Sequence, residues 1–402
     1  MKIVDISHSG SGVARENCKV VFVRGTDIGE DVVVRIVKST AKFEVGKVAK
    51  INVRSPYRTT PPCPYFGECG GCDFQHIEYH RELALKEIML RNELKKVGYF
   101  GEISVEVSKQ IYLYRNKLKH TYRSGELGYL GDDDMFVKIN SCMLADNEIL
   151  RALEGVKTYL QKYSFKYLKN ITFRRFQGGV MLVFLFSERE KFSLDNCLEK
   201  YPVFLAVGEV LESDKTKIFQ SYNESGVRYE ILGEVFPVDA KSFLQVNCEV
   251  AENLYSHVLK NVAGEVVVNA YSGQGVLSKL LAKKAKKVIG IEMQTSAHKI
   301  AEAIKSENME NIHAKVEDVI AKFSKVANVI VLDPARNGCH TRVLEEIIRS
   351  KIAKVVYISC NFSTLARDLK RLEKFYKIVN IKIFDMFPRT ANLETCVILE
   401  KF

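Results

Sequence analysis

One cysteine in the chain comes directly after an expected buried strand. The apolar run 355–358 (V-V-Y-I) predicts that strand, and Ser359-Cys360-Asn361 ends it. In a parallel α/β sheet, ligands and reactive groups gather at the carboxyl ends of the strands. Cys360 is therefore a candidate nucleophile. Free cysteine is also among the most commonly buried residue types, so this stretch alone leaves a packing role open.

Three further cysteines, Cys63, Cys69 and Cys72, have the spacing C-x5-C-x2-C in a segment rich in glycine and proline. Such a loop can turn its thiolates towards one centre, and a fourth ligand would complete a zinc site or an iron–sulfur cluster. Cys142, which follows an expected hairpin over 125–139, is the predicted fourth ligand. The x5 gap argues against radical enzymes that use S-adenosyl-L-methionine (SAM), which have C-x3-C-x2-C. The spacing leaves zinc and iron–sulfur both open.

A glycine turn in the C-terminal part has the geometry of a nucleotide-type ligand site. The strand 266–270 is followed by Y-S-G-Q-G (271–275), and glycines at a strand-to-helix turn let the backbone approach a ligand. The next strand ends at Glu292, where a carboxylate can bind ribose hydroxyls. The full G-x-G-x-x-G of dinucleotide-binding proteins is missing, because Ser278 occupies the third glycine's place. The shorter form is typical of SAM-dependent methyltransferases.

Three domains are expected in this multidomain chain of 402 residues, which is too long for one ordinary core. Short β-branched runs separated by glycines predict a small β-barrel over residues 1–54. Residues 55–235 contain the cysteine cluster and a helix expected over 78–97, and we expect a central α+β domain there. Alternating strands and helices over 236–402 predict a Rossmann-like α/β domain.

The charge balance suits a nucleic acid partner. Lys and Arg number 60 against 49 Asp and Glu, giving a net charge of +11, and phosphate backbones attract such an excess. Residues 112–120 (Y-L-Y-R-N-K-L-K-H) interleave cations with aromatic rings. In RNA binding, Arg115 and Lys117 would contact phosphates and the rings would stack on unpaired bases. A solvated strand face is the alternative.

The sequence predicts a cytoplasmic protein with no membrane partner. No apolar run approaches the roughly 20 residues that span a bilayer, and the N-terminus lacks a secretory signal. Thiols stay reduced in the cytoplasm, so the ten cysteines favour metal or catalytic use over disulfides. No protein partner is evident, and we expect a monomer.

The whole set of motifs resembles the RNA 5-methyluridine methyltransferases. The first 54 residues resemble the TRAM domain, an OB-like barrel found in RNA-modifying enzymes. The C-terminal motifs occur in the family's order: K-S-F-L-Q-V-N (241–247), Y-S-G-Q-G (271–275), G-I-E (290–292), D-P-A-R-N-G (333–338), Y-I-S-C-N-x-x-T-L-A-R-D (357–368) and D-M-F-P-R-T-x-N-L-E (385–394). Family members often have Pro at Phe362, Gln at Arg389 and His-Val at Asn392-Leu393, which leaves the local shape of the base pocket open.

The resemblance implies two cofactors and a set of site residues. It implies a [4Fe–4S] cluster on the four cysteines named above, with Cys142 as the fourth ligand. It implies SAM contacts at Gln245, Tyr271 and Glu292, and Asp333 at the junction of SAM and the target base. Phe243 would stack on a uracil extruded from its stack.

Methylation of uracil at carbon 5 explains why such residues are needed. Carbon 5 is a poor nucleophile until a thiolate, here Cys360, adds to carbon 6. A base must then remove the proton from carbon 5, and Glu394 matches that role in the family. We expect donors near Cys360 to favour its thiolate, and the apolar neighbours Phe387 and Leu393 to raise the pKa of Glu394.

Several functions remain open at this point. The TRAM-like module with a cluster favours 23S ribosomal RNA as the substrate, and the T-loop uridine of transfer RNA is the alternative. A cluster-containing RNA-binding protein or chaperone without activity is a third possibility, which would need neither Cys360 nor Glu394. An adenine-N6 methyltransferase is disfavoured, because Ala335-Arg336 stand where its motif has an aromatic residue.

Overall fold

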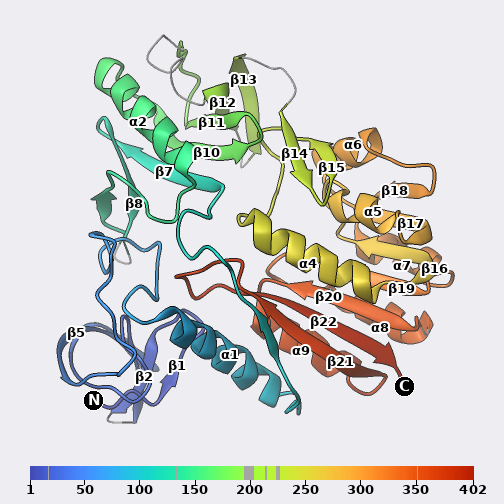
Figure 1. Cartoon of the computed structure of the whole chain (residues 1–402), viewed down its shortest axis with the longest axis horizontal. Helices are drawn as coiled ribbons and strands as arrows, with labels where there is room; N and C mark the ends of the chain where they lie inside the picture. Colours follow the sequence, from blue (N-terminus) through green and yellow to red (C-terminus); the bar gives the residue numbers. More distant parts are fainter. Residues whose placement is uncertain (17, 132–133, 194–202, 213–214, 223–226, 351) are drawn as a thin grey trace.

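The computed structural model describes residues 1–16, 18–131, 134–193, 203–212, 215–222, 227–350 and 352–402. Its N-terminal unit, drawn in dark blue in Figure 1, is a five-stranded sheet in the order β1-β2-β3-β5-β4. Apolar residues at alternate strand positions, such as Val21 and Val23, form its small core. The strands are β1 (Asp5–Ile6), β2 (Gly12–Glu16), β3 (Lys19–Val23), β4 (Asp31–Ser39) and β5 (Phe43–Val53). The expected β-rich N-terminal domain is confirmed.

A second sheet of seven strands follows, in the order β13-β12-β11-β10-β7-β8-β9. Helix α2 (Asn147–Lys162) packs against it, and Asp146 caps this helix by accepting from the Glu148 backbone N–H. The strands are β7 (Lys117–Arg123), β8 (Glu126–Leu130), β9 (Phe136–Lys138), β10 (Leu168–Phe176), β11 (Gly179–Phe186), β12 (Val203–Glu212) and β13 (Lys215–Tyr222). The strands β14 (Arg228–Ile231) and β15 (Glu234–Pro237) form a separate hairpin.

The C-terminal domain is an eight-stranded sheet in the order β18-β17-β16-β19-β20-β22-β21-β6. Its strands are β6 (Ser104–Glu106), β16 (Gly264–Ala270), β17 (Ala285–Glu292), β18 (Met309–His313), β19 (Val329–Leu332), β20 (Lys354–Ser359), β21 (Tyr376–Phe384) and β22 (Glu394–Lys401). The helices are α4 (Cys248–Asn261), α5 (Val276–Leu281), α6 (Thr295–Ala303), α7 (Val316–Phe323), α8 (Thr341–Ser350) and α9 (Phe362–Leu372). Pairing is parallel from β18 to β20, and helices pack against the sheet, as expected for a Rossmann-like domain.

The register of the sheet brings three strand ends together. Leu332 at the end of β19 pairs with Tyr357 of β20, so Asp333 and Cys360 follow neighbouring strands at one edge. Strand β22 runs antiparallel to β20, and Ser359 pairs with Thr395. Glu394, at the start of β22, therefore lies at that same edge.

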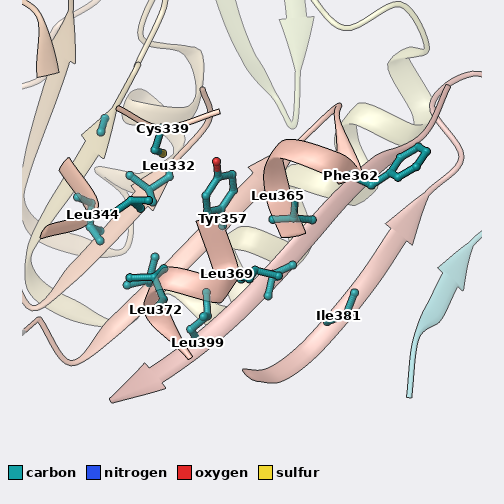
Figure 2. Close-up of a cluster of buried hydrophobic side chains, with 14 of the residues drawn as sticks. Leu332, Cys339, Leu344, Tyr357, Phe362, Leu365, Leu369, Leu372, Ile381 and Leu399 are labelled. Carbon is teal, nitrogen blue, oxygen red and sulfur yellow. The ribbon is translucent and has the colours of Figure 1, made fainter. Parts of the chain in front are cut away.

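Helix α9 fixes the strand that precedes Cys360. Phe362, Leu365, Leu369 and Leu372 recur at helical spacing and are buried against the sheet (Figure 2). Tyr357 lies in the same cluster, and its hydroxyl donates to Asp368 at 2.7 Å. The segment on both sides of Cys360 is thus packed on a rigid core.

Two elements from earlier in the chain join this domain. Helix α1 (Tyr79–Lys95), which confirms the helix expected over 78–97, shares a hydrophobic core with α9. Strand β6 pairs in parallel with β21 at the sheet edge. The division of the chain at residues 54 and 235 stays a prediction, and these contacts show that part of 55–235 packs with the C-terminal sheet.

Within the described residues, no helix is both long enough and apolar enough to cross a lipid bilayer.

Candidate functional site

A cavity of about 510 Å³ opens at the sheet edge where the three strand ends meet. Its walls come from the glycine turn, from the segment before α4 and from the ends of β19, β20 and β22. The lining includes Phe243, Gln245, Tyr255, Tyr271, Gly273, Asp333, Arg336, Cys360, Phe387 and Glu394. Residues predicted separately from the sequence as nucleophile, base and ligand contacts thus share one cavity.

Cys360 lies between the end of β20 and the start of α9. The next residue, Asn361, caps α9 by accepting from the Ser363 N–H at 3.1 Å, and its amide donates to the Arg336 carbonyl at 2.9 Å. Burial, together with the carboxyls of Glu394 and Asp333, raises the pKa of the Cys360 thiol to about 11. Arg336 and a backbone hydrogen bond lower this pKa, as expected of donors near Cys360, but burial and the two carboxyls outweigh them.

The carboxyl groups of buried Glu394 and half-buried Asp333 line the cavity with the thiol. Glu394 is 3% exposed, and burial holds its pKa well above the usual value, with a smaller contribution from Asp333. Burial also raises the pKa of Asp333 to about 7. Leu393 beside Glu394 is buried, and Phe387 lines the cavity, so the expected apolar setting of Glu394 is confirmed. A carboxyl with a raised pKa can hold a proton near neutral pH.

The glycine turn presents backbone to the cavity. Tyr271, Gly273 and Gly275 have φ angles of 61°, 55° and 80°, a region that glycine enters freely and tyrosine rarely. Glu292 accepts from the Gly273 N–H at 2.9 Å and does not itself line the cavity. A Cβ built on Gly273 would meet open space. Glu292 thus orders the turn, while Gln245 and Tyr271 face the cavity directly.

Comparison with known proteins reveals the family. The TRAM domain model matches residues 2–49, and the model described as tRNA (Uracil-5-)-methyltransferase matches residues 314–402. An uncharacterized RNA methyltransferase of Bacillus cereus is 32% identical over 98% of this chain and 94% of its own. Another, of Thermotoga maritima, is 31% identical over 100% of this chain and 98% of its own. The chain belongs to the RNA uracil-5 methyltransferase family.

The methyltransferase is accordingly a SAM-dependent enzyme that acts on carbon 5 of uracil in RNA. Its fold matches the crystal structure of the Pyrococcus abyssi tRNA (uracil-54, C5)-methyltransferase in complex with S-adenosyl-L-homocysteine. The TM-score is 0.80 and the identity 24%, with 99% of each chain covered. The open glycine turn fits a SAM-sized ligand, and the buried side-chain oxygen of Gln274 has no hydrogen-bond partner in the protein.

The four cysteines predicted as metal ligands line a second cavity, of about 250 Å³. Among the described residues, no His, Cys, Asp or Glu group of three or more is close enough together to hold a metal ion. A cubane cluster needs wider spacing than a single ion, because its own iron and sulfide atoms lie between the thiolates. Burial, together with the neighbouring thiols Cys142, Cys69 and Cys63, raises the pKa of Cys72 to about 12. The four cysteines therefore fit a metal cofactor that stabilises thiolates.

The residues predicted to contact RNA lie in different parts of the structure. Phe243 is 72% exposed at the rim of the 510 Å³ cavity, where a ring could meet a base. Arg115 instead lines the cysteine cavity, and its Nε donates to the Lys117 carbonyl at 3.2 Å. Lys117 is half-buried, and burial lowers its pKa to about 8. Sequence composition alone did not distinguish these environments.

Sequence reasoning missed two features of the site. Tyr255 of α4 lines the cavity near Asp333 and Glu394, whose charges raise its pKa together with burial. A buried ion network around Lys86 and Asp385 supports the loop before Glu394. Neither feature could be predicted from the sequence, because a tyrosine or lysine in a helix has the same local pattern whichever way its side chain points.

The thiol pKa predicts an unusual pH dependence for alkylation of Cys360. Only the thiolate reacts with iodoacetamide, so at pH 8 the native protein should react roughly tenfold more slowly at Cys360 than a free thiol of pKa near 9, since the smaller thiolate fraction outweighs the greater nucleophilicity of a more basic thiolate. The rate should still rise tenfold per pH unit up to pH 10. Glu394→Gln should lower the midpoint, because it removes a negative charge. Mass spectrometry of the peptide that contains Cys360 measures the rate, and a midpoint below 9 would contradict this account.

Proposed function

We propose that the enzyme methylates one uridine of a structured RNA by covalent catalysis at Cys360, with 23S ribosomal RNA as the substrate. The observation that best supports covalent catalysis is the shared cavity, in which Cys360, Asp333 and Glu394 meet beside the glycine turn. When bound, SAM supplies the methyl group that carbon 5 of uracil receives. The remaining steps fall to side chains of this chain.

The proposed reaction uses one thiol and two carboxyl groups. The Cys360 thiol gives its proton to the Asp333 carboxylate, its sulfur bonds to carbon 6 of uracil as a thiolate, and carbon 5 becomes nucleophilic. After carbon 5 takes the methyl group, Glu394 removes the proton from carbon 5, and the carbon–sulfur bond breaks to return the thiolate. The raised pKa of Glu394 increases its affinity for the proton that it must accept from carbon 5.

Binding of the target base would change the electrostatics of the thiol. Cys360 is held largely as a thiol in the open cavity by burial and by the two carboxyls. Protonation of Asp333 or Glu394 removes a negative charge beside the sulfur and so favours the thiolate. Asp333, with a pKa near 7, can carry such a proton at the working pH. We propose that Asp333 binds the base edge in this protonated form.

We further propose that Cys63, Cys69, Cys72 and Cys142 hold a [4Fe–4S] cluster. When bound, the cluster would tie loop 63–72 to the segment after hairpin β8–β9. All four thiols line the 250 Å³ cavity, and a cluster stabilises the thiolates that burial and mutual repulsion disfavour.

Chemical analysis tests the cluster. Protein prepared without oxygen should be brown and contain about four iron and four sulfide per chain. Cys72→Ala should lose most of the iron, whereas Cys248→Ala should keep it, because Cys248 is a half-buried free thiol that does not line the cysteine cavity. Zinc in place of iron in the parent protein would contradict the proposed cluster.

The RNA target is tested in cells. A strain without this protein should lose 5-methyluridine at one position of 23S ribosomal RNA, and the Cys360→Ala variant should fail to restore it. Loss in the T-loop of transfer RNA instead would assign the alternative substrate. The matched family model and the Pyrococcus abyssi enzyme both name transfer RNA. Unchanged 5-methyluridine in both RNAs would overturn the proposed function.

A further inference from the structure

The loop that leads into Glu394, residues 385–393, is held by residues from far earlier in the chain. We call this segment the base loop. Three successive carbonyls of the base loop accept hydrogen bonds from residues 73–114. The bonds are Lys86 Nζ to Phe387 O (3.1 Å), the Tyr114 hydroxyl to Pro388 O (2.9 Å), and the Asp73 and Phe74 N–H groups to Arg389 O (2.8 and 3.1 Å).

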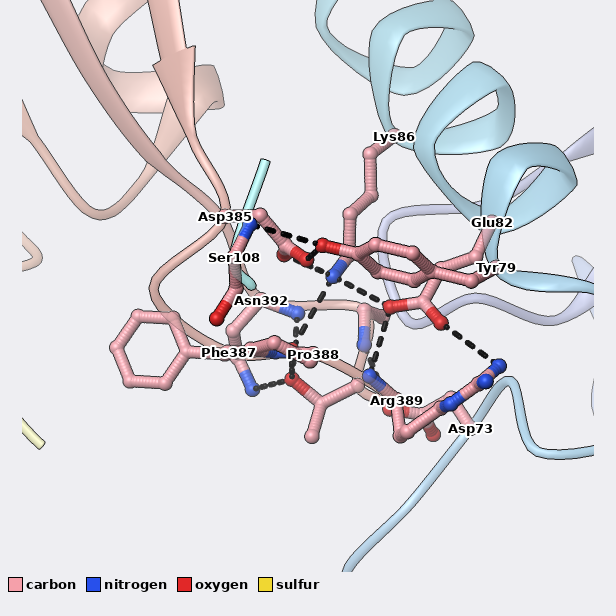
Figure 3. A network of polar contacts seen from close by, with 12 residues as sticks. Asp73, Tyr79, Glu82, Lys86, Ser108, Asp385, Phe387, Pro388, Arg389 and Asn392 are labelled. Carbon is pink, nitrogen blue, oxygen red and sulfur yellow. Dashed lines mark hydrogen bonds and ion pairs between the residues drawn. The ribbon is translucent and has the colours of Figure 1, made fainter. Parts of the chain in front are cut away.

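Buried charges hold the same loop from helix α1 (Figure 3). Lys86 lies between Glu82 at 2.8 Å and Asp385 at 2.6 Å, and all three side chains are fully buried. Glu82 also accepts from the Arg389 backbone N–H at 2.7 Å. Two cations thus face two carboxylates in the interior, where an unpaired charge would be strongly destabilising.

Arg389 needs this support because its backbone is strained. Its φ angle is 69°, which a residue with a side chain adopts only where the surroundings impose it. Its guanidinium lies over the rings of Tyr79 and Tyr112, 5.6 and 5.2 Å from their centroids. Nη1 donates to the Ile77 carbonyl at 3.1 Å. The shape of the base loop is therefore set by residues outside it.

Asp73 links the base loop to the cysteines. It follows Cys72 directly and contacts the base loop on two sides. Its N–H donates to Arg389 O, and its carboxylate accepts from the Ala391 N–H at 2.8 Å, only three residues before Glu394. The other carboxylate oxygen accepts from Arg24 of the N-terminal domain at 2.6 Å. A shift of the cysteine loop would therefore move the base loop with it.

Cys360 is held by different contacts. It lies between β20 and α9, and the bond from Asn361 to the Arg336 carbonyl fixes its neighbour. None of the described hydrogen bonds of Asp73 reaches this segment. Movement of the cysteine loop should displace the base and leave the nucleophile in place.

We propose that Asp73 is a positioning residue through which the cysteine loop, residues 63–76, sets the place of the catalytic base. The inference rests on the proposed role of Glu394 in elimination. Loss of the Asp73 carboxylate should slow proton removal from carbon 5 while the covalent adduct still forms at Cys360. The cysteine loop then affects one step of catalysis, proton removal from carbon 5, in addition to any contact that it makes with RNA.

Single-turnover kinetics on full-length protein tests the proposal with Asp73→Ala and Asp73→Asn. In Asp73→Ala, adduct formation should stay within about threefold of the parent, while product release falls about 10–100-fold and the covalent protein–RNA complex accumulates. Asp73→Asn keeps an oxygen that can accept from Ala391, so it should restore most of the product release. Parallel loss of both steps in Asp73→Ala, or no loss of either, would overturn the proposal.

Arg58→Met serves as the matched control. Arg58 forms a similar buried ion pair, with Glu30 at 2.6 Å, and has no described contact with the base loop. It should show no accumulation of the covalent complex. Glu394→Gln separates the two hypotheses. If Glu394→Gln does not accumulate the covalent complex, the proposed function fails. If Glu394→Gln accumulates the complex and Asp73→Ala does not, only the inference about Asp73 fails.

Discussion

Replacing Cys360 with alanine is expected to abolish methylation, lowering the rate by at least about 10⁴-fold. Cys360 is the only cysteine among the described residues that line the cavity, so without it carbon 6 has no thiolate partner and carbon 5 stays too weak a nucleophile to take the methyl group. Cys360→Ser should be nearly as inactive, because a hydroxyl ionises far less readily than a thiol. Transfer of a radiolabelled methyl group from SAM to RNA measures the effect.

A second cysteine provides the control. Cys18 is an exposed free thiol in the N-terminal domain, outside the lining of both cavities. Cys18→Ser should keep full activity. RNA binding by Cys360→Ala should also stay near that of the parent, since the smaller side chain leaves the cavity wall otherwise intact. Substantial methylation by Cys360→Ala would refute the nucleophile assignment.

Replacing Glu394 with glutamine is expected to stop the reaction after methyl transfer. Glutamine has nearly the same shape but cannot accept a proton, so turnover should fall by about 10²–10⁴-fold. The methylated uracil should stay bonded to Cys360, because the bond to carbon 6 breaks only when the proton on carbon 5 leaves. Gel electrophoresis under denaturing conditions should show the protein–RNA complex.

Glu400 lies on the same strand and gives a matched comparison. It is at the opposite end of β22 and forms a half-exposed pair with Lys354 at 3.0 Å. Glu400→Gln should turn over at the parent rate with no trapped complex. In the parent, elimination should quicken as pH rises through the raised pKa of Glu394, because only the deprotonated carboxylate accepts the proton. Normal turnover by Glu394→Gln would exclude Glu394 as the base.

Local pattern predicted the parts of the site that belong to strand ends. The run before Cys360, the glycine turn and the acidic end of β17 each carry a periodicity or a turn signal within a few residues, and each lies where the pattern indicates. The β-rich N-terminal unit and the helix α1 were predictable for the same reason.

Contacts between distant segments were not predictable in this way. No local pattern shows that Lys86 pairs with Asp385, about 300 residues later, or that Arg115 faces the cysteines. The raised pKa of the Cys360 thiol was not predictable either, because the sequence places Cys360 at a strand end without showing that two carboxyls and burial surround it. Arg389 differs from the residue common in its family, and only the structure supplies its partner, Glu82.

The most direct test of the account is to trap the enzyme on RNA that contains 5-fluorouridine. Fluorine replaces the hydrogen on carbon 5, so after methyl transfer no proton can be removed and the adduct persists. Digestion and mass spectrometry should then find a methylated fluorouridine attached to Cys360, with no adduct in Cys360→Ala. An adduct on another residue, or methylation of normal RNA with no adduct on the fluorinated one, would contradict covalent catalysis at Cys360.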